Sequence, residues 1–139
     1  MKICIVCYAN YCRSPVAEHL FKNKFPIQHI FFSRGLSPKT SSNMDPRSQK
    51  YLENVGIKKI MHFPKKITLN DLKESDLILA LDPLILNDLN LKFPSYRFKI
   101  KSMNFMCPKI ILQDPYTLND EGYVSVMRKI TEVCEKTEF

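Results

Sequence analysis

An apolar strand that runs directly into a polar loop and then a helix is the feature that most constrains this chain. Residues 2–7 are rich in β-branched side chains and almost continuously apolar, which is typical of a strand buried on both faces. Polar residues 8–14 follow, and a helical stretch opens at Pro15 with Ser14 in the N-cap position. This order predicts a βαβ unit, and therefore a parallel sheet.

Apolar runs and helical patterns alternate along the rest of the chain. Further strands are expected near residues 27–32, 77–81 and 96–100, and helices near residues 46–54, 68–74, 83–91 and 122–136. We therefore predict a single α/β domain over residues 1–139. Its architecture would be an open, twisted, mainly parallel four-stranded sheet with helices on both faces. Ligands of such sheets bind beyond the carboxyl ends of the strands, where residues 8–14 are expected to lie.

Charge and cysteine content limit the classes of partner that the protein can bind and the cellular compartment in which it is expected. The formal charge of +7 favours anionic partners. The lysines are scattered and no recognition motif accompanies them, so we expect no nucleic-acid partner. No apolar run approaches the roughly 20 residues needed to span a bilayer, and we expect no membrane partner. The five cysteines are odd in number and favour a reducing compartment, the cytoplasm.

Five residues separate Cys7 from Arg13, and a hydroxyl, Ser14, follows. Backbone N–H groups in a loop that ends at a helix N-terminus point inward and can hold an anion. Such a setting favours ionisation of a thiol, while an arginine can offer two parallel donors to phosphate oxygens. The pattern alone is too short to decide against a buried thiol and a solvated arginine. Its place between a strand and a helix favours a cradle for a tetrahedral dianion above a nucleophile.

The segment VCYANYCRSPVAE, residues 6–18, resembles the signature loop of the low-molecular-weight protein tyrosine phosphatases, whose pattern is close to VCxGNxCRSPxAE. Four further segments resemble landmarks of that family in the family's order: Ser33-Arg34-Gly35, Asp45-Pro46-Arg47, Leu81-Asp82 and Asp114-Pro115-Tyr116. The resemblance covers nearly the whole chain. It implies metal-independent hydrolysis of phosphotyrosine proteins or small aryl phosphates, with no cofactor and no metal, by a monomer or weak dimer.

The resemblance also implies a role for each residue of the site. Cys7 would attack phosphorus to form a phosphocysteine, Arg13 would stabilise the transition state, and Asp114 would act as general acid and then as base. The residues expected to bind the phosphate or to support the loop are Tyr8, Ala9, Asn10, Tyr11, Cys12, Ser14 and Ser33. Asn10 is expected at a positive φ, which asparagine tolerates better than most residues.

The walls of the substrate slot depart from the family pattern. Tyr116 is expected to form one wall, but the loop at residues 37–44 has no aromatic residue where many relatives carry Trp or Tyr. Tyr8 and Tyr11 could supply aromatic surface instead. Ala9 replaces the usual loop glycine, and Thr117 replaces the second tyrosine of the family's DPYY segment. These departures put the preference for protein substrates in doubt.

Three roles stay open at the level of sequence. Cys12 is either a partner of Cys7 in a protective disulfide, as in the family, or a packed thiol. His62 either joins the network that braces the loop or is a surface histidine. Asp82 either lies near Arg13 or caps a helix.

Two alternatives to a phosphatase can be weighed. An arsenate reductase-like thiol enzyme on the same fold would need further cysteines after the third strand, and residues 81–91 contain none. Cys4 and Cys7 have the spacing of a metal pair, but a strand places them on opposite faces, and no second pair exists. The phosphatase interpretation is favoured.

Overall fold

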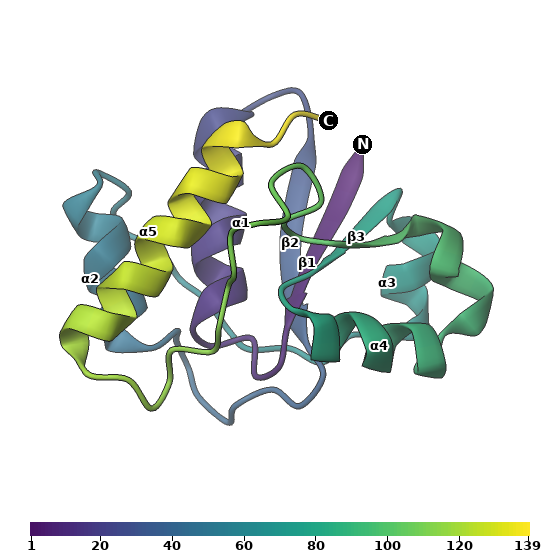
Figure 1. Cartoon of the computed structure of the whole chain (residues 1–139), viewed down its shortest axis with the longest axis horizontal. Helices are drawn as coiled ribbons and strands as arrows, with labels where there is room; N and C mark the ends of the chain where they lie inside the picture. Colours follow the sequence, from purple (N-terminus) through teal and green to yellow (C-terminus); the bar gives the residue numbers. More distant parts are fainter.

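A four-stranded sheet forms the middle layer of the computed structural model, which describes residues 1–139 (Figure 1). Its strands lie in the order β2-β1-β3-β4, with β1 at Lys2–Cys7, β2 at Ile30–Gly35, β3 at Leu77–Ala80 and β4 at Ile100–Ser102. Every pairing is parallel. The predicted α/β sheet is confirmed, and it is wholly rather than mainly parallel.

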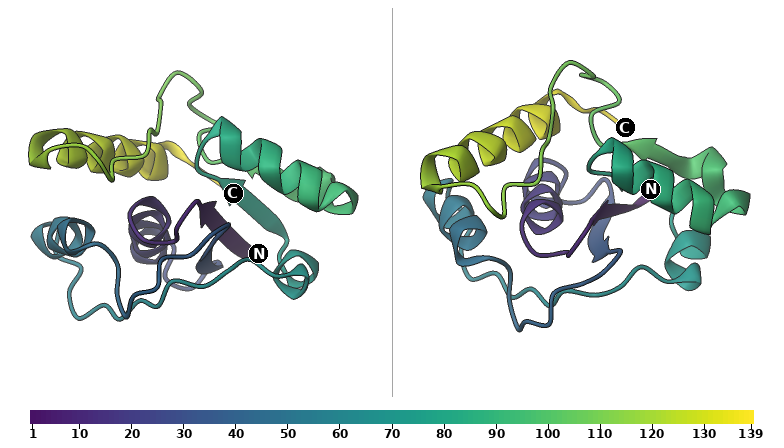
Figure 2. Two further views of the ribbon diagram at one scale, coloured as in Figure 1. Left: turned by 90° about the horizontal axis from the view of Figure 1, so that it is seen from below. Right: turned by 60° about the horizontal axis from the view of Figure 1, so that its bottom comes forward.

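Helices cover both faces of the sheet (Figures 1 and 2). One side carries α1 (Arg13–Lys24), α2 (Pro46–Asn54) and α5 (Asp120–Lys136), and the other carries α3 (Leu69–Glu74) and α4 (Pro83–Lys92). Helix α1 packs on β1 and β2 and also against α5. No helix is long and apolar enough to cross a membrane.

The central strand explains the continuous apolar run at the start of the chain. Residues 3–6 of β1 are fully buried, because a neighbouring strand lies on each side and helices lie above and below. Burial of this kind contributes about 25 cal/mol for each Å² of apolar surface removed from water. In the register of β1 and β2, Cys7 lies opposite Gly35. The two strands therefore end together, at the edge where the polar loop begins.

Some element boundaries differ from the predicted ones. The second strand is Ile30–Gly35 rather than residues 27–32, and Ile27 is 90 % exposed in the preceding turn. The fourth strand begins only at Ile100, because the proline-led segment Pro94–Lys99 forms a 3-10 helix. Helix α1 begins at Arg13, and its N-cap is Cys12 without a side-chain cap bond. The predicted N-cap role of Ser14 was wrong.

Candidate active site

The loop between β1 and α1 packs tightly against the end of β2. A Cβ atom at Gly35 would lie 2.9 Å from the backbone nitrogen of Asn10 and 2.9 Å from the carbonyl oxygen of Tyr8. Both contacts are with backbone atoms, which could move aside only if the whole loop shifted. A glycine at the end of β2 therefore lets the loop fold against the sheet edge.

The carbonyl groups of this loop all point outward, into hydrogen bonds with the rest of the protein. The six consecutive carbonyls from Cys7 to Cys12 accept, in order, from the amides of Leu36, Ser37 and Lys39, the ring of His62, the amide of Asp45 and the hydroxyl of Ser48. Their lengths lie between 2.7 and 3.2 Å. The N–H groups from Tyr8 to Ser14, by contrast, donate to no protein group. A consecutive row of backbone N–H groups without protein partners can form an anion-binding nest.

Asn10 organises the inside of the loop. It is fully buried and has the predicted positive φ, 51°. Its Oδ1 accepts from the backbone N–H of Lys65 at 2.9 Å, which fixes the orientation of the amide. Its Nδ2 therefore donates to the hydroxyls of Ser14, at 2.8 Å, and Ser33, at 3.0 Å.

These bonds set the direction of the contact between Ser14 and Cys7, whose Oγ and Sγ atoms are 2.9 Å apart. Because Ser14 Oγ already accepts from Asn10, its own proton is free to point at the sulfur. A hydroxyl donor at this distance stabilises a negatively charged sulfur relative to a neutral thiol. The hydroxyl of Ser14 thus serves the loop and not the helix cap.

Two more residues complete the bracing. Ser33 donates to Glu18 at 2.5 Å, and this buried carboxylate also accepts from Lys22. Glu18 belongs to the VCYANYCRSPVAE segment, which was the only sequence signal for this role. His62 is buried and its Nε2 donates to the carbonyl of Asn10 at 2.7 Å, so it joins the network, and the surface alternative was wrong. Burial lowers the pKa of His62 and favours the neutral ring.

Arg13 is the first residue of α1 and is 2 % exposed. Its Nη1 donates both to Asp82 Oδ2 at 2.8 Å and to the carbonyl of Leu112 at 2.7 Å. These contacts hold the guanidinium from one end and leave Nε and Nη2 without a protein partner. Asp82 also accepts from the amide of Ile85 and caps α4. It therefore performs both of the roles that the sequence left open.

Cys7, Arg13 and Asp114 all line one cleft of about 440 Å³. Tyr8, Ala9, Tyr11, Cys12 and Tyr116 also line it, together with Ser37, Pro38 and Lys39. Asp114 is exposed, and its carboxylate accepts from the amide of Tyr116 at 3.1 Å. The structure thus brings together all the residues expected to act in catalysis, although they are separated by more than a hundred positions.

The second thiol of the loop differs from the first. Cys12 is buried, and its Sγ is 3.9 Å from Asp45 Oδ2. Burial raises its pKa to about 12, so near neutral pH it is a packed, neutral thiol. All five cysteines are free. No group of three or more His, Cys, Asp or Glu side chains is arranged to hold a metal ion.

The family model described as low molecular weight phosphotyrosine protein phosphatase matches residues 2–138. The chain belongs to this family. A low molecular weight protein-tyrosine-phosphatase of Acinetobacter johnsonii is 30% identical over 132 residues, covering 95% of this chain and 91% of the relative.

Solved structures agree with this assignment at the level of the fold. The tyrosine phosphatase amsI of Erwinia amylovora has a TM-score of 0.89 at 25% identity, covering 97% of this chain and 89% of that one. A low molecular weight phosphotyrosine phosphatase of Vibrio cholerae has a TM-score of 0.90 at 22% identity, with 98% and 93% covered. The resemblance stated from the signature segments is confirmed.

The rim of the cleft is where this low-molecular-weight phosphatase departs from the family pattern. The Nζ of Lys39 donates to the hydroxyl of Tyr116 at 3.0 Å and lies 5.1 Å from the ring centroid of Tyr11. The two tyrosine rings meet edge to face at 6.3 Å. A lysine therefore lies opposite Tyr116, in a loop, residues 37–44, that has no aromatic residue. The sequence reasoning missed it, since a lysine in a polar loop gives no local signal.

Proposed function

We propose that the protein hydrolyses phosphotyrosine and other aryl phosphate monoesters through a phosphocysteine on Cys7. The observation that carries this proposal is the loop whose carbonyls all bond outward while its N–H groups, from Tyr8 to Ser14, remain unpaired. Such a row of donors, at the N-terminus of α1, matches the oxygens of a phosphate dianion. Cys7 lines the same cleft.

In the first step, the thiolate of Cys7 would attack phosphorus as the bond from phosphorus to the phenolic oxygen breaks. Asp114 would give its proton to the departing phenolate. The loop amides, with the free Nε and Nη2 of Arg13, would stabilise the charge on the equatorial oxygens. Ser14 would hold its hydroxyl proton toward the sulfur, at the 2.9 Å separation of the two atoms.

In the second step, Asp114, now ionised, would take a proton from water. The water would attack the phosphocysteine, and the sulfur would leave as a thiolate, again facing the hydroxyl of Ser14. Inorganic phosphate is released and the enzyme returns to its starting state. Because the nest and Arg13 supply the positive charge, the reaction as proposed uses no metal and no cofactor.

The proposed chemistry also argues against an arsenate reductase-like enzyme and for a location in the cytoplasm. An arsenate reductase-like cycle needs a relay of cysteines, and α4 and the turn before it contain none. A mechanism that depends on a free Cys7 thiol needs reducing conditions, and five free thiols fit the cytoplasm.

Hydrolysis of para-nitrophenyl phosphate in the presence of EDTA tests the proposal. Wild-type protein should turn over, and Cys7→Ser should lower kcat by about 10⁴-fold or more. Cys107→Ser, a matched thiol change outside the cleft, should keep wild-type activity. Retained turnover in Cys7→Ser, or loss of activity with EDTA, would overturn the mechanism. Arsenate-dependent consumption of a thiol reductant without phosphatase activity would favour the rival.

The role of Asp114 can be tested separately through the leaving group. Asp114→Asn should lower kcat by about 10²–10⁴-fold for phenyl phosphate. The loss should be smaller for para-nitrophenyl phosphate, whose leaving phenolate is stable without a proton. Equal losses for the two substrates would show that Asp114 does not protonate the leaving group.

A further inference from the structure

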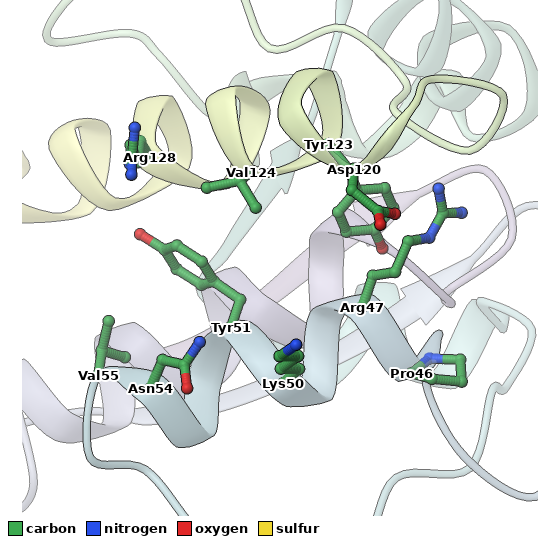
Figure 3. A pocket seen from close by; sticks show the side chains of 10 residues that line it. All are labelled: Pro46, Arg47, Lys50, Tyr51, Asn54, Val55, Asp120, Tyr123, Val124 and Arg128. Atoms are coloured by element: carbon green, nitrogen blue, oxygen red, sulfur yellow. The ribbon is translucent and has the colours of Figure 1, made fainter.

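A second cavity, larger than the catalytic cleft, lies between α2 and α5 (Figure 3). Its volume is about 670 Å³, which is within the range of about 300–1,000 Å³ typical of small-molecule sites. None of its lining residues belongs to the catalytic cleft. The proposed phosphatase chemistry uses no part of it.

The lining combines apolar and cationic groups. Tyr51 from α2 and Val55, which directly follows α2, face Val124 from α5 across the cavity, and Tyr123 lies at its inner side (Figure 3). The charged lining residues are Arg47, Lys50, Arg128 and Asp120, three cations against one acid.

Two of the cations are unengaged. Lys50 and Arg128 are exposed and form no salt bridge and no hydrogen bond with the protein. Arg47, by contrast, is paired with Asp45. The cavity thus offers an apolar interior between two free positive charges, one on each helix.

We infer that this cavity is a second binding site, and that its ligand is a small aromatic anion. The apolar side chains of Tyr51, Val55 and Val124 would hold a planar ring, and Lys50 and Arg128 would pair with a phosphate, sulfonate or carboxylate carried by that ring. A neutral ligand would leave both cations unpaired, and a bare inorganic anion would leave the apolar interior unfilled. Charge and shape together therefore select an aromatic anion.

Two residues of the cavity also reach the catalytic site. The hydroxyl of Tyr123 is 2.5 Å from Ser48 Oγ, and Ser48 donates to the carbonyl of Cys12. Cys12 belongs to the loop between β1 and α1, residues 7–14, which we call the phosphate loop. Arg47 lies 4.0 Å from the ring centroid of Tyr123. It donates to the carbonyls of Tyr116 and Leu118, in the segment that follows Asp114. A ligand that displaces Tyr123 would therefore act on the phosphate loop, and one that displaces Arg47 would act on the segment after Asp114. Occupancy is expected to alter turnover.

Binding can be measured without any catalysis. Anilinonaphthalene sulfonate, an aromatic sulfonate, serves as the probe, with inorganic phosphate present to occupy the nest. We expect amide chemical shifts in the NMR spectrum to change along α2 and α5, and Arg128→Glu or Lys50→Glu to raise the Kd about tenfold, equivalent to about 1.4 kcal/mol.

Lys129→Glu is the matched control, because it makes the same charge reversal one position along α5. Lys129 is exposed, has no salt bridge and does not line the cavity, so its Kd should match the wild type. Val124→Trp, which fills the cavity without changing charge, should also abolish binding. Equal affinity in Arg128→Glu and Lys129→Glu would overturn the inference, as would chemical shifts confined to the phosphate loop and abolished by phosphate.

The link to catalysis has its own readout. Saturating probe should change kcat for para-nitrophenyl phosphate in wild-type protein and in Lys129→Glu, and leave it unchanged in Val124→Trp. An unchanged kcat in wild type despite measured binding would overturn the link. If the protein proved not to be a phosphatase, the chemical shifts would still test whether the cavity between α2 and α5 binds the probe.

Discussion

The floor and the rim of the cleft are built in different ways. The floor, the phosphate loop, is held by six carbonyl hydrogen bonds and by the buried amide of Asn10. The rim consists of exposed side chains such as Tyr116, 47% exposed, joined to the opposite loop by a hydrogen bond from Lys39. In the floor, backbone N–H groups in fixed positions serve as donors to the phosphate. In the rim, exposed side chains contact the rest of the substrate through their shape and charge. We therefore expect changes in the floor to cost far more than changes in the rim.

Arg13→Lys should produce the largest effect among these tests of the floor. Lysine keeps the charge but cannot pair with Asp82 and offer parallel donors to phosphate at the same time. We expect kcat to fall by about 10²–10³-fold, as for the loss of one preorganised donor. Arg34→Lys is the matched control, since Arg34 pairs with Asp71 outside the cleft. A similar, small fall in kcat in both variants would mean that catalysis does not depend on the exact donor geometry of Arg13.

Asn10→Ala should destabilise the fold by about 2–4 kcal/mol, measured by urea unfolding. The change removes three hydrogen bonds of a buried side chain and places alanine at a positive φ. Asn10→Gly removes the same bonds without the backbone penalty, and should recover about 1 kcal/mol of the loss. If Asn10→Ala unfolds at the same urea concentration as Lys39→Ala, floor and rim are equally tolerant and the contrast fails.

The same contrast explains what the sequence could predict. The spacing of Cys7, Arg13 and Ser14 and the strand before them are local signals, and they located the floor and the parallel sheet. The positive φ of Asn10 followed from residue type and position. The hydrogen bond of Lys39 to Tyr116 joins residues 77 positions apart, and a contact across that distance depends on the whole fold.

The misplaced boundaries have a cause that lies outside the local sequence. Residues 27–32 and 96–100 are apolar enough for strands, but composition does not fix where a strand pairs with its neighbour. Pairing sets Ile30 opposite Lys2 and Ile100 opposite Ile78, which moves both strands toward the C-terminus. The hydroxyl of Ser14 was assigned to a helix cap for a related reason, because a local rule cannot register the distant groups that compete for it.

His62 links the floor to pH. Burial lowers its pKa in the folded state, so the unfolded chain binds the proton more readily. The stabilisation by neutral His62 is complete above its ordinary pKa of about 6.5 and is lost as the pH falls below that value. His62→Gln keeps a donor for the carbonyl of Asn10 but does not titrate. Between pH 8 and pH 5, the unfolding free energy of the wild type should fall by more than that of the variant. Parallel curves would show that His62 titrates alike in both states.

Lys39→Ala should have the smallest effect, and it should change only the preference among substrates. The hydrogen bond to Tyr116 raises the pKa of Lys39, so the rim stays cationic at neutral pH. An ion pair made by an exposed lysine is weak, because solvent and salt screen it. The KM for a phosphotyrosine peptide with an adjacent acidic residue should therefore rise by no more than about fivefold, while kcat and the KM for para-nitrophenyl phosphate stay unchanged. Lys92→Ala, on α4, controls for net charge. A fall in kcat in Lys39→Ala would show that the lysine acts on the chemistry of the floor, and that the division between rim and floor is wrong.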